Sequence, residues 1–139
     1  MVWPKEVAHS ISHKILVVDD ERRIADTLAL ILQHGGYETA TAYDGPSALA
    51  LCAKFQPDLV LTDAEMPGMS GIELATAVSG NIPRCKVLLF SGQAATAQML
   101  ERARKQGIDF PLVSKPIHPE ELLKKIAKIL NSSELHLIA

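Results

Sequence analysis

The chain has few cysteines, no surplus of positive charge and no long apolar run, and each shortage excludes a class of protein. Cys52 and Cys85 are too few for a disulfide scaffold, and neither belongs to a CxxC pair. We expect both to be reduced, buried thiols. Fourteen Lys and Arg residues against sixteen Asp and Glu residues give a formal charge of -2, and no basic stripe runs along the sequence. Direct nucleic-acid binding is therefore not expected.

Segments that would enter a membrane or direct secretion are also lacking. No apolar run reaches the roughly 18 residues of a membrane-spanning helix. Pro4, Lys5 and Glu6 interrupt the N-terminus before the apolar core of a signal peptide could form. These features predict a cytoplasmic domain without membrane insertion.

The chain does have the size and apolar content of one globular domain. It contains 139 residues, of which 47% are hydrophobic and 22% charged. At this length roughly 68–70% of the surface of the unfolded chain can be buried, so folding needs neither a disulfide nor a metal. We expect an N-terminal extension over 1–13, a domain over 14–131 and a C-terminal tail over 132–139. The starting Met1 and this tail favour a complete small protein.

Short apolar or β-prone runs alternate with segments of helical period. The runs cover 15–18, 37–42, 59–62, 87–90 and 110–113. Between the first two, apolar residues at positions 24, 28, 31 and 32 have the spacing of one helix face, and Gly35-Gly36 ends the pattern. Repeated strand–helix units of this kind predict a mostly parallel sheet.

The composition of the five runs predicts their order in the sheet. Those at 15–18, 59–62 and 87–90 are continuously apolar, as in central strands covered on both faces. The run at 37–42 is mixed, and a central strand would not tolerate Pro111 in the last run, so both belong at the edges. We predict an α/β, flavodoxin-like (βα)5 fold, doubly wound, with a five-stranded parallel sheet of order 2-1-3-4-5 and helices on both faces.

Two further segments begin with residues typical of helix N-termini. Asp44 precedes Gly45-Pro46, which places proline near the first helical position. Ser70 and Glu73 have the spacing of a capping box. We expect a helix to start at each of these points.

Polar residues follow the predicted strands where each strand ends. Asp19 and Asp20 follow the first, Asp63 the third, Ser91 the fourth and Lys115 the fifth. Ligands of open parallel sheets bind beyond this edge, near the point where the strand order reverses. Carboxylates from two adjacent strands share a small volume comfortably only with a compensating cation or added protons. Mg²⁺, which takes one or two carboxylates together with phosphate oxygens, suits such a site.

Each of these residues also has an ordinary structural interpretation. Asp20 could cap the first helix, and Glu21 could complement the helix dipole. Asp63 could be a loop acid, Ser91 a cap for the fourth helix and Lys115 a solvated surface charge. The combination favours a site, because the residue types complement one another and all fall at the same predicted edge.

Four segments resemble the receiver domain of two-component response regulators, the class of the chemotaxis regulator. They are Ile15-Leu16-Val17-Val18-Asp19-Asp20-Glu21, Asp63-Ala64-Glu65-Met66-Pro67-Gly68-Met69-Ser70-Gly71, Ser91 and Lys115-Pro116. The second fits the D-x-x-M-P-x-M-x-G pattern of that family. The resemblance covers roughly residues 14–131, with the segments in the expected order. Met66 and Met69 are expected to pack in the core rather than to perform chemistry.

The resemblance implies a role for each residue of the predicted site. Asp63 corresponds to the phosphoacceptor, which becomes an aspartyl phosphate. Asp19, Asp20, Asp63 and the backbone carbonyl of Glu65 correspond to the Mg²⁺ ligands. Ser91 would donate its hydroxyl to a phosphoryl oxygen, and Lys115 would neutralise the phosphoryl charge. The Lys115-Pro116 bond is expected to be cis.

One position departs from the family pattern. The family usually carries Tyr or Phe on the fifth strand, three residues before the lysine, as part of the switch. Counting back from Lys115 gives Leu112, whereas alignment on Gly107-Ile108-Asp109 gives Pro111, and Phe110 is the nearest aromatic residue. The usual aromatic readout is therefore in doubt, although the phosphorylation chemistry is not.

The leading hypothesis is a phosphoacceptor in a two-component phosphorelay that is not an enzyme in the usual sense. It would catalyse only its own phosphorylation and slow dephosphorylation, in which Glu65 and Gln93 could tune the attacking water. Its partners would be a histidine kinase or a histidine phosphotransfer protein, and a downstream protein that binds the face formed by the fourth helix, fifth strand and fifth helix.

Two other functions remain open. The departure at Leu112 favours a phosphorylation-independent scaffold or dimerisation module, with a possible homodimer. A phosphohydrolase with an aspartate nucleophile is disfavoured, because Glu65 stands where the haloacid-dehalogenase-like motif has a second aspartate.

Overall fold

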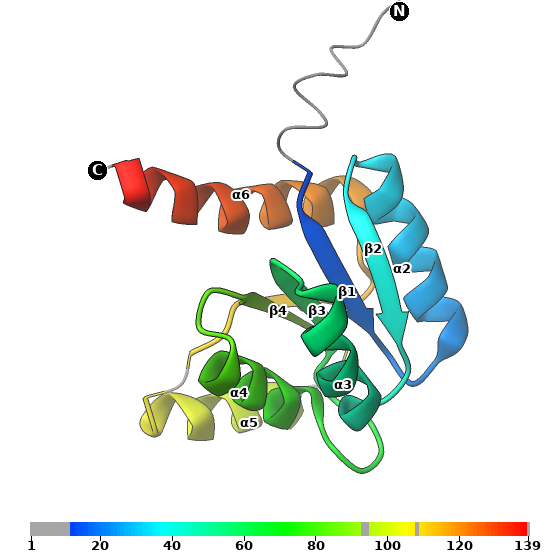
Figure 1. Cartoon of the computed structure of the whole chain (residues 1–139). Helices are drawn as coiled ribbons and strands as arrows, with labels where there is room; N and C mark the ends of the chain where they lie inside the picture. The colour runs from blue at the N-terminus through cyan, green and yellow to red at the C-terminus, as the bar shows by residue number, and fades with distance from the viewer. Residues whose placement is uncertain (1–11, 93–94, 108, 139) are drawn as a thin grey trace, which may run out of the picture.

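The computed structural model of the chain describes residues 12–92, 95–107 and 109–138, with side chains left undescribed at 95–96 and 132–138. A five-stranded parallel sheet has the order β2-β1-β3-β4-β5 (Figure 1). Its strands are β1 (Lys14–Val18), β2 (Glu38–Ala42), β3 (Leu59–Asp63), β4 (Lys86–Ser91) and β5 (Leu112–Ser114). The helices are α2 (Arg22–His34), α3 (Gly45–Phe55), α4 (Gly71–Asn81), α5 (Ala95–Lys105) and α6 (Pro119–Ile138). The predicted fold class and strand order are confirmed.

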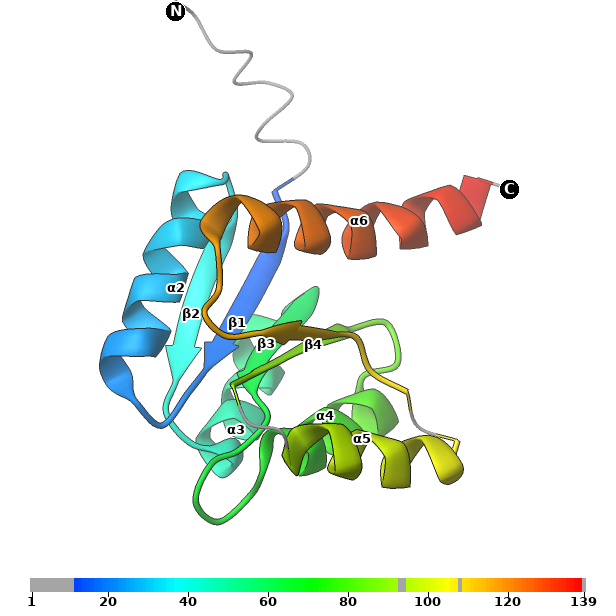
Figure 2. The ribbon, with the colours of Figure 1, turned by 180° about the vertical axis from the view of Figure 1, so that it is seen from behind.

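Helices cover both faces of the sheet, and the alternation of side chains along each strand forms two cores. In β1, Ile15 and Val17 face the core shared with α2 and α6, which lie on one side of the sheet (Figures 1 and 2). Leu16 and Val18 face the core shared with α3, α4 and α5. The central strands are therefore buried on both faces, which explains their continuous apolar composition.

The edge strands also lie where the sequence predicts, but β5 is shorter than the predicted run at 110–113. It begins at Leu112, directly after Pro111, whose carbonyl accepts a hydrogen bond from the Leu89 N–H at 3.0 Å. Proline lacks an N–H, so it can contribute only its carbonyl to the ladder. The start of the strand is displaced for this reason.

Both predicted helix starts are confirmed. The Asp44 side chain accepts a hydrogen bond from the Ser47 N–H at 2.7 Å, and Pro46 lies in the first turn of α3. Ser70 and Glu73 form both bonds of a capping box at the start of α4, with lengths of 3.0 and 3.1 Å. Each cap satisfies backbone donors that the first helical turn leaves unpaired.

The C-terminal helix runs through the segment predicted as a tail. α6 extends to Ile138, so the boundary placed after residue 131 falls inside a helix. Neither glycine nor proline follows Leu130 to end it. Within the described residues, none of the helices is both long enough and apolar enough to span a membrane.

Candidate functional site

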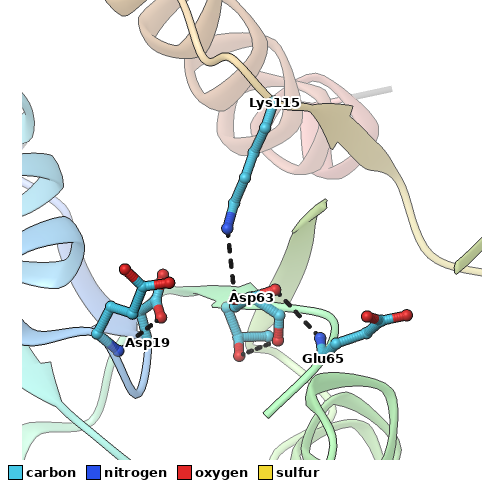
Figure 3. A network of polar contacts seen from close by, with 6 residues as sticks. Asp19, Asp63, Glu65 and Lys115 are labelled. Carbon is cyan, nitrogen blue, oxygen red and sulfur yellow. Dashed lines mark hydrogen bonds and ion pairs between the residues drawn. The ribbon is translucent and has the colours of Figure 1, made fainter. Parts of the chain in front are cut away.

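The polar residues singled out in the sequence converge at the carboxyl ends of the central strands. Asp19 follows β1 directly, Asp63 is the last residue of β3, Ser91 is the last residue of β4 and Lys115 follows β5. Figure 3 shows Lys115 reaching from the segment after β5 toward Asp63, with Asp19 to the left of Asp63. The parallel arrangement brings these strand ends to one edge, as the sequence predicts.

Three carboxylates form the core of this site. Asp19, Asp20 and Asp63 each offer an oxygen, and these oxygens all lie within 4.8 Å of one another. Asp19 and Asp63 are buried, whereas Asp20 is exposed. Their negative charges repel at this separation unless a cation or protons compensate them. Oxygen ligands of this number and type suit a hard divalent ion such as Mg²⁺.

Asp19 has one oxygen that the described residues leave unsatisfied. Its side chain is fully buried, and Oδ1 accepts a hydrogen bond from the Glu21 backbone N–H at 2.9 Å. Oδ2 is also buried but has no hydrogen-bond partner among the described residues. A buried carboxylate oxygen without a partner is costly, and a bound cation would satisfy it. The site therefore fits a metal ion by its geometry as well as by its composition.

The environment of Asp19 makes the charged carboxylate less favourable than that of an ordinary aspartate when no cation is present. Burial raises the pKa of the Asp19 carboxyl from 3.8 to about 6, and the Asp63 and Asp20 carboxylates also act to raise it. The Glu21 N–H and the Lys115 ammonium oppose this rise in pKa. Keeping Asp19 charged at neutral pH therefore costs free energy that a cation can recover.

Asp63 is held by one contact at each carboxylate oxygen. Oδ1 accepts a hydrogen bond from the Glu65 backbone N–H at 3.1 Å, and Oδ2 lies 3.4 Å from Lys115 Nζ. The backbone N–H of Ala64 donates to the Phe90 carbonyl at 2.9 Å, which ties the segment after β3 to the end of β4. These contacts fix the direction of the carboxylate while it still borders the rim of the sheet.

The loop that follows Asp63 is packed closely beneath it. A Cβ atom at Gly71 would overlap the backbone carbonyl oxygen of Asp63, so any larger residue would displace the carboxylate or the start of α4. Met66 is buried in the core beside α3, α4 and α5, and Met69 packs against the same core. The expectation that the two methionines are packing residues is confirmed.

Ser91 and Lys115 are connected through the backbone. Ser91 is buried and pairs in register with Ser114, and its carbonyl accepts a hydrogen bond from the Lys115 N–H at 2.9 Å. The Lys115-Pro116 peptide bond is cis, as the resemblance implied. The lysine side chain is partly exposed and points back toward Asp63 (Figure 3).

The interpretation of Asp20 as a helix cap is wrong. The N-cap residue of α2 is Glu21, and no side-chain cap bond is formed there within the described residues. The chain turns after Asp19, whose Oδ1 takes up the Glu21 N–H. Asp20 is consequently left exposed beside Asp63, where it can bind a ligand.

The two residues considered for the position of the family's aromatic switch differ in their place relative to β5. Leu112 pairs with Leu89 in β5, three residues before Lys115, and Pro111 lies outside the strand. Phe110 packs partly buried against the core beside α3, α4 and α5. Of these two residues, only Leu112 belongs to the strand.

Phe90 belongs to the site, although its place in the apolar run 87–90 indicates only a core residue. The Lys115 ammonium lies 5.1 Å from the centroid of its ring. The signal that could have revealed it is register: in a sheet of order 2-1-3-4-5, the residue before Ser91 lies beside the last residue of the third strand.

Comparison with known proteins defines the class of this fold and site. The family profile of the response regulator receiver domain matches residues 15–127. The chain belongs to the response regulator receiver domain family.

Individual relatives agree with this assignment. The DNA-binding response regulator MtrA of Mycolicibacterium smegmatis is 30% identical over 127 residues, which cover 90% of this chain and 54% of that protein. A response regulator receiver protein of Anaeromyxobacter is 37% identical over 110 residues, covering 79% of this chain and 45% of that protein. The chain thus spans about half the length of the curated relatives it matches.

Solved structures of similar size share the fold. A CheY-like receiver domain protein from Methanospirillum hungatei superposes with a TM-score of 0.80 at 30% identity, covering 90% of this chain and 98% of that one. The chemotaxis protein CheY4 of Vibrio cholerae gives a TM-score of 0.74 at 31% identity, covering 84% and 98% of the two chains.

Proposed function

We propose that this receiver domain is a phosphoacceptor whose reacting group is the Asp63 carboxylate. One observation carries the proposal: the site combines a buried Asp19 carboxylate oxygen that has no partner among the described residues with an ammonium 3.4 Å from Asp63. That set suits a divalent cation on one side of Asp63 and a phosphoryl group between the cation and Lys115. A histidine kinase or a histidine phosphotransfer protein would supply the phosphoryl group.

In the proposed reaction, an oxygen of Asp63 attacks the phosphorus of a phosphohistidine. The new bond is O–P, the P–N bond breaks, and its electron pair returns to the imidazole of the donor. Lys115 compensates the negative charge of the phosphoryl oxygens, and the Ser91 hydroxyl donates a hydrogen bond to one of them. The Glu65 N–H holds Asp63 in the attacking direction.

Asp19, Asp20, Asp63 and the backbone carbonyl of Glu65 would hold Mg²⁺. The ion, when bound, supplies positive charge to the transferring phosphoryl group and offsets the crowding of the carboxylates. Slow hydrolysis of the aspartyl phosphate would return the domain to its starting state, and the side chain of Glu65 would tune the attacking water. Gln93, the second residue considered for this role, lies outside the described residues.

Labelling with a small phosphodonor tests this proposal. Incubation with acetyl phosphate and Mg²⁺ should add one phosphoryl group to the wild-type protein, detected by intact-mass spectrometry, and none to Asp63→Ala. Asp109→Ala is the matched control, because Asp109 is an exposed acid whose described ion pair is with Arg104 rather than with a site residue. Equal labelling of wild type and Asp63→Ala would reject the assignment.

A second candidate is a scaffold or dimerisation module that does not use phosphorylation, and the leucine at position 112 favours it. Under the first proposal, phosphorylation changes the affinity of a partner protein for the face formed by α5, β5 and α6. Sedimentation of the full chain with and without beryllofluoride, a phosphoryl mimic, separates the two for self-association. A beryllofluoride-dependent change supports the switch, whereas a dimer of unchanged affinity supports the scaffold.

A further inference from the structure

Phe90 occupies a position from which it can act on the site without touching the reacting atoms. It is fully buried in β4 and pairs in register with Asp63 of β3 and Val113 of β5. Phe90 and Val113 both belong to the core beside α2 and α6. Lys115 lies two residues after Val113, so the alternation along the chain returns its side chain to this same face.

Asp63 and the Phe90 ring both attract the Lys115 ammonium, in addition to the Asp19 carboxylate. Nζ lies 3.4 Å from Asp63 Oδ2, which is long for a charge-assisted hydrogen bond, and 5.1 Å from the centroid of the Phe90 ring. An ammonium over an aromatic face within about 6 Å is attracted by the ring quadrupole. The ring is enclosed by core residues and cannot move away, whereas the lysine stem is flexible.

We propose that Phe90 is a positioning residue for Lys115. The ring keeps the ammonium above the carboxyl end of β3, so that Lys115 is already in place when a phosphoryl group reaches Asp63. Without the ring, the four-carbon stem of the partly exposed lysine would sample positions away from the site. The entropy lost on ordering it would then add to the activation free energy of phosphorylation. The inference rests on the proposed function, in which Lys115 compensates the phosphoryl charge.

The competing interpretation is that Phe90 only fills the core. Two matched substitutions separate these interpretations: Phe90→Met removes the ring and keeps an apolar side chain of similar reach, and Leu88→Met is its control. Leu88 is equally buried, lies two residues earlier in β4 and faces the same core. Thermal unfolding of both variants checks that each is folded and shows how far each loses stability.

The first test is a double-mutant cycle on the rate of phosphorylation by acetyl phosphate with Mg²⁺. Phe90→Met should slow wild type about three- to tenfold, the range of a partly desolvated cation–π contact, and should slow Lys115→Met less than about twofold. Leu88→Met should change either rate less than about twofold. Equal slowing by Phe90→Met in both backgrounds, or no slowing in either, would overturn the proposal.

The second test does not depend on activity. Protons of the Lys115 ε-methylene beside the ring face should resonate upfield of ordinary lysines, move to the ordinary position in Phe90→Met and stay shifted in Leu88→Met. An ordinary resonance in the wild type would overturn the positioning role. If the wild type takes no label from acetyl phosphate, the proposed function fails, while this resonance still decides where the ring holds the lysine.

Discussion

The carboxylates at the two ends of the parallel sheet differ in how fully their oxygens are paired. At the amino end, Asp58 lies just before β3; its Oδ2 accepts a hydrogen bond from the Lys14 N–H at 2.8 Å, and its Oδ1 lies 3.7 Å from Arg84. The Asp58 backbone also bonds to the Lys14 carbonyl at 2.7 Å and to the Lys86 N–H at 2.9 Å. At the carboxyl end, Asp19, Asp20 and Asp63 share one small volume, and Asp19 Oδ2 has no partner among the described residues.

The difference in pairing separates carboxylates that stabilise the fold from carboxylates that form the candidate site. A carboxylate with a partner at each oxygen, such as Asp58, contributes to stability. A buried carboxylate beside others of the same charge, such as Asp19, lowers stability unless a cation binds. The polar set at the carboxyl end therefore suits the binding of a cation, and without one it lowers the stability of the fold.

The largest effect should come from neutralising Asp19. Asp19→Asn keeps the shape of the side chain and removes its negative charge. The pKa of the Asp19 carboxyl is raised from 3.8 to about 6, a shift worth about 3 kcal/mol. Chemical denaturation at about pH 8 with a chelator should show the variant more stable than wild type by up to about that amount. A less stable variant would mean that the Asp19 charge is compensated in the metal-free protein.

The pKa of Asp19 also predicts how the stability difference between Asp19→Asn and wild type varies with pH. Because the pKa of Asp19 is about 6 in the folded protein and 3.8 when unfolded, the folded state binds more protons between these values. The contribution of Asp19 to the free energy of unfolding therefore falls as pH rises from about 4 to about 6 and is level above. Denaturation of wild type and Asp19→Asn across this range should show their difference growing to its full size. A difference independent of pH would contradict the assigned pKa.

Mg²⁺ should reverse part of this cost in the wild type. An ion that binds only the folded state at about 100 times its dissociation constant stabilises by about 2.7 kcal/mol. Thermal unfolding with increasing Mg²⁺ should therefore raise the Tm of wild type and leave Asp19→Asn nearly unchanged. Mg²⁺-free buffer with matched NaCl is the control for ionic strength, and equal rises in both proteins would indicate an effect away from the site.

At the opposite end of the sheet, removing Asp58 should have the reverse sign. Asp58→Ala leaves the Lys14 N–H without its 2.8 Å acceptor and should lower the free energy of unfolding by about 1–2 kcal/mol. The rate of phosphorylation by acetyl phosphate should stay within about twofold of wild type, since the residue lies at the far end of the sheet. A large loss of rate with unchanged stability would break the division between the two ends.

The smallest effect should follow from Arg84. Its side chain is 60% exposed and its ion pair with Asp58 spans 3.7 Å, so Arg84→Ala should cost less than about 0.5 kcal/mol. Denaturation at low and high salt would show whether even this contribution depends on screening. A cost equal to that of Asp58→Ala would show that the ion pair, rather than the bond to Lys14, matters at this end.

The sequence predicts the sheet well because the composition of a short strand depends on its burial. Central strands, buried on two faces, are continuously apolar, whereas edge strands are mixed or contain proline. The sequence places Asp19, Asp63, Ser91 and Lys115 together because parallel strands end at one edge. It does not reveal that the Asp19 side chain accepts the Glu21 N–H, or that Glu21 rather than Asp20 is the N-cap residue of α2.

Other features depend on contacts between distant segments. The Pro111 carbonyl accepts a hydrogen bond from the Leu89 N–H although Pro111 lies outside β5, and no local pattern specifies this bond. The contact between Lys115 and Phe90 requires the register of β4 against both of its neighbours. Register of this kind is set by the whole sheet, which is why the local sequence misses it.

The most direct measurement is the position of the acyl phosphate. The full chain is incubated with acetyl phosphate and Mg²⁺, reduced with borohydride to trap the aspartyl phosphate as homoserine, digested and sequenced by mass spectrometry. We expect homoserine at position 63, dependent on Mg²⁺ and strongly diminished in Asp19→Asn. Homoserine at another aspartate, or none under conditions that label a known receiver domain, would contradict the assignment of Asp63.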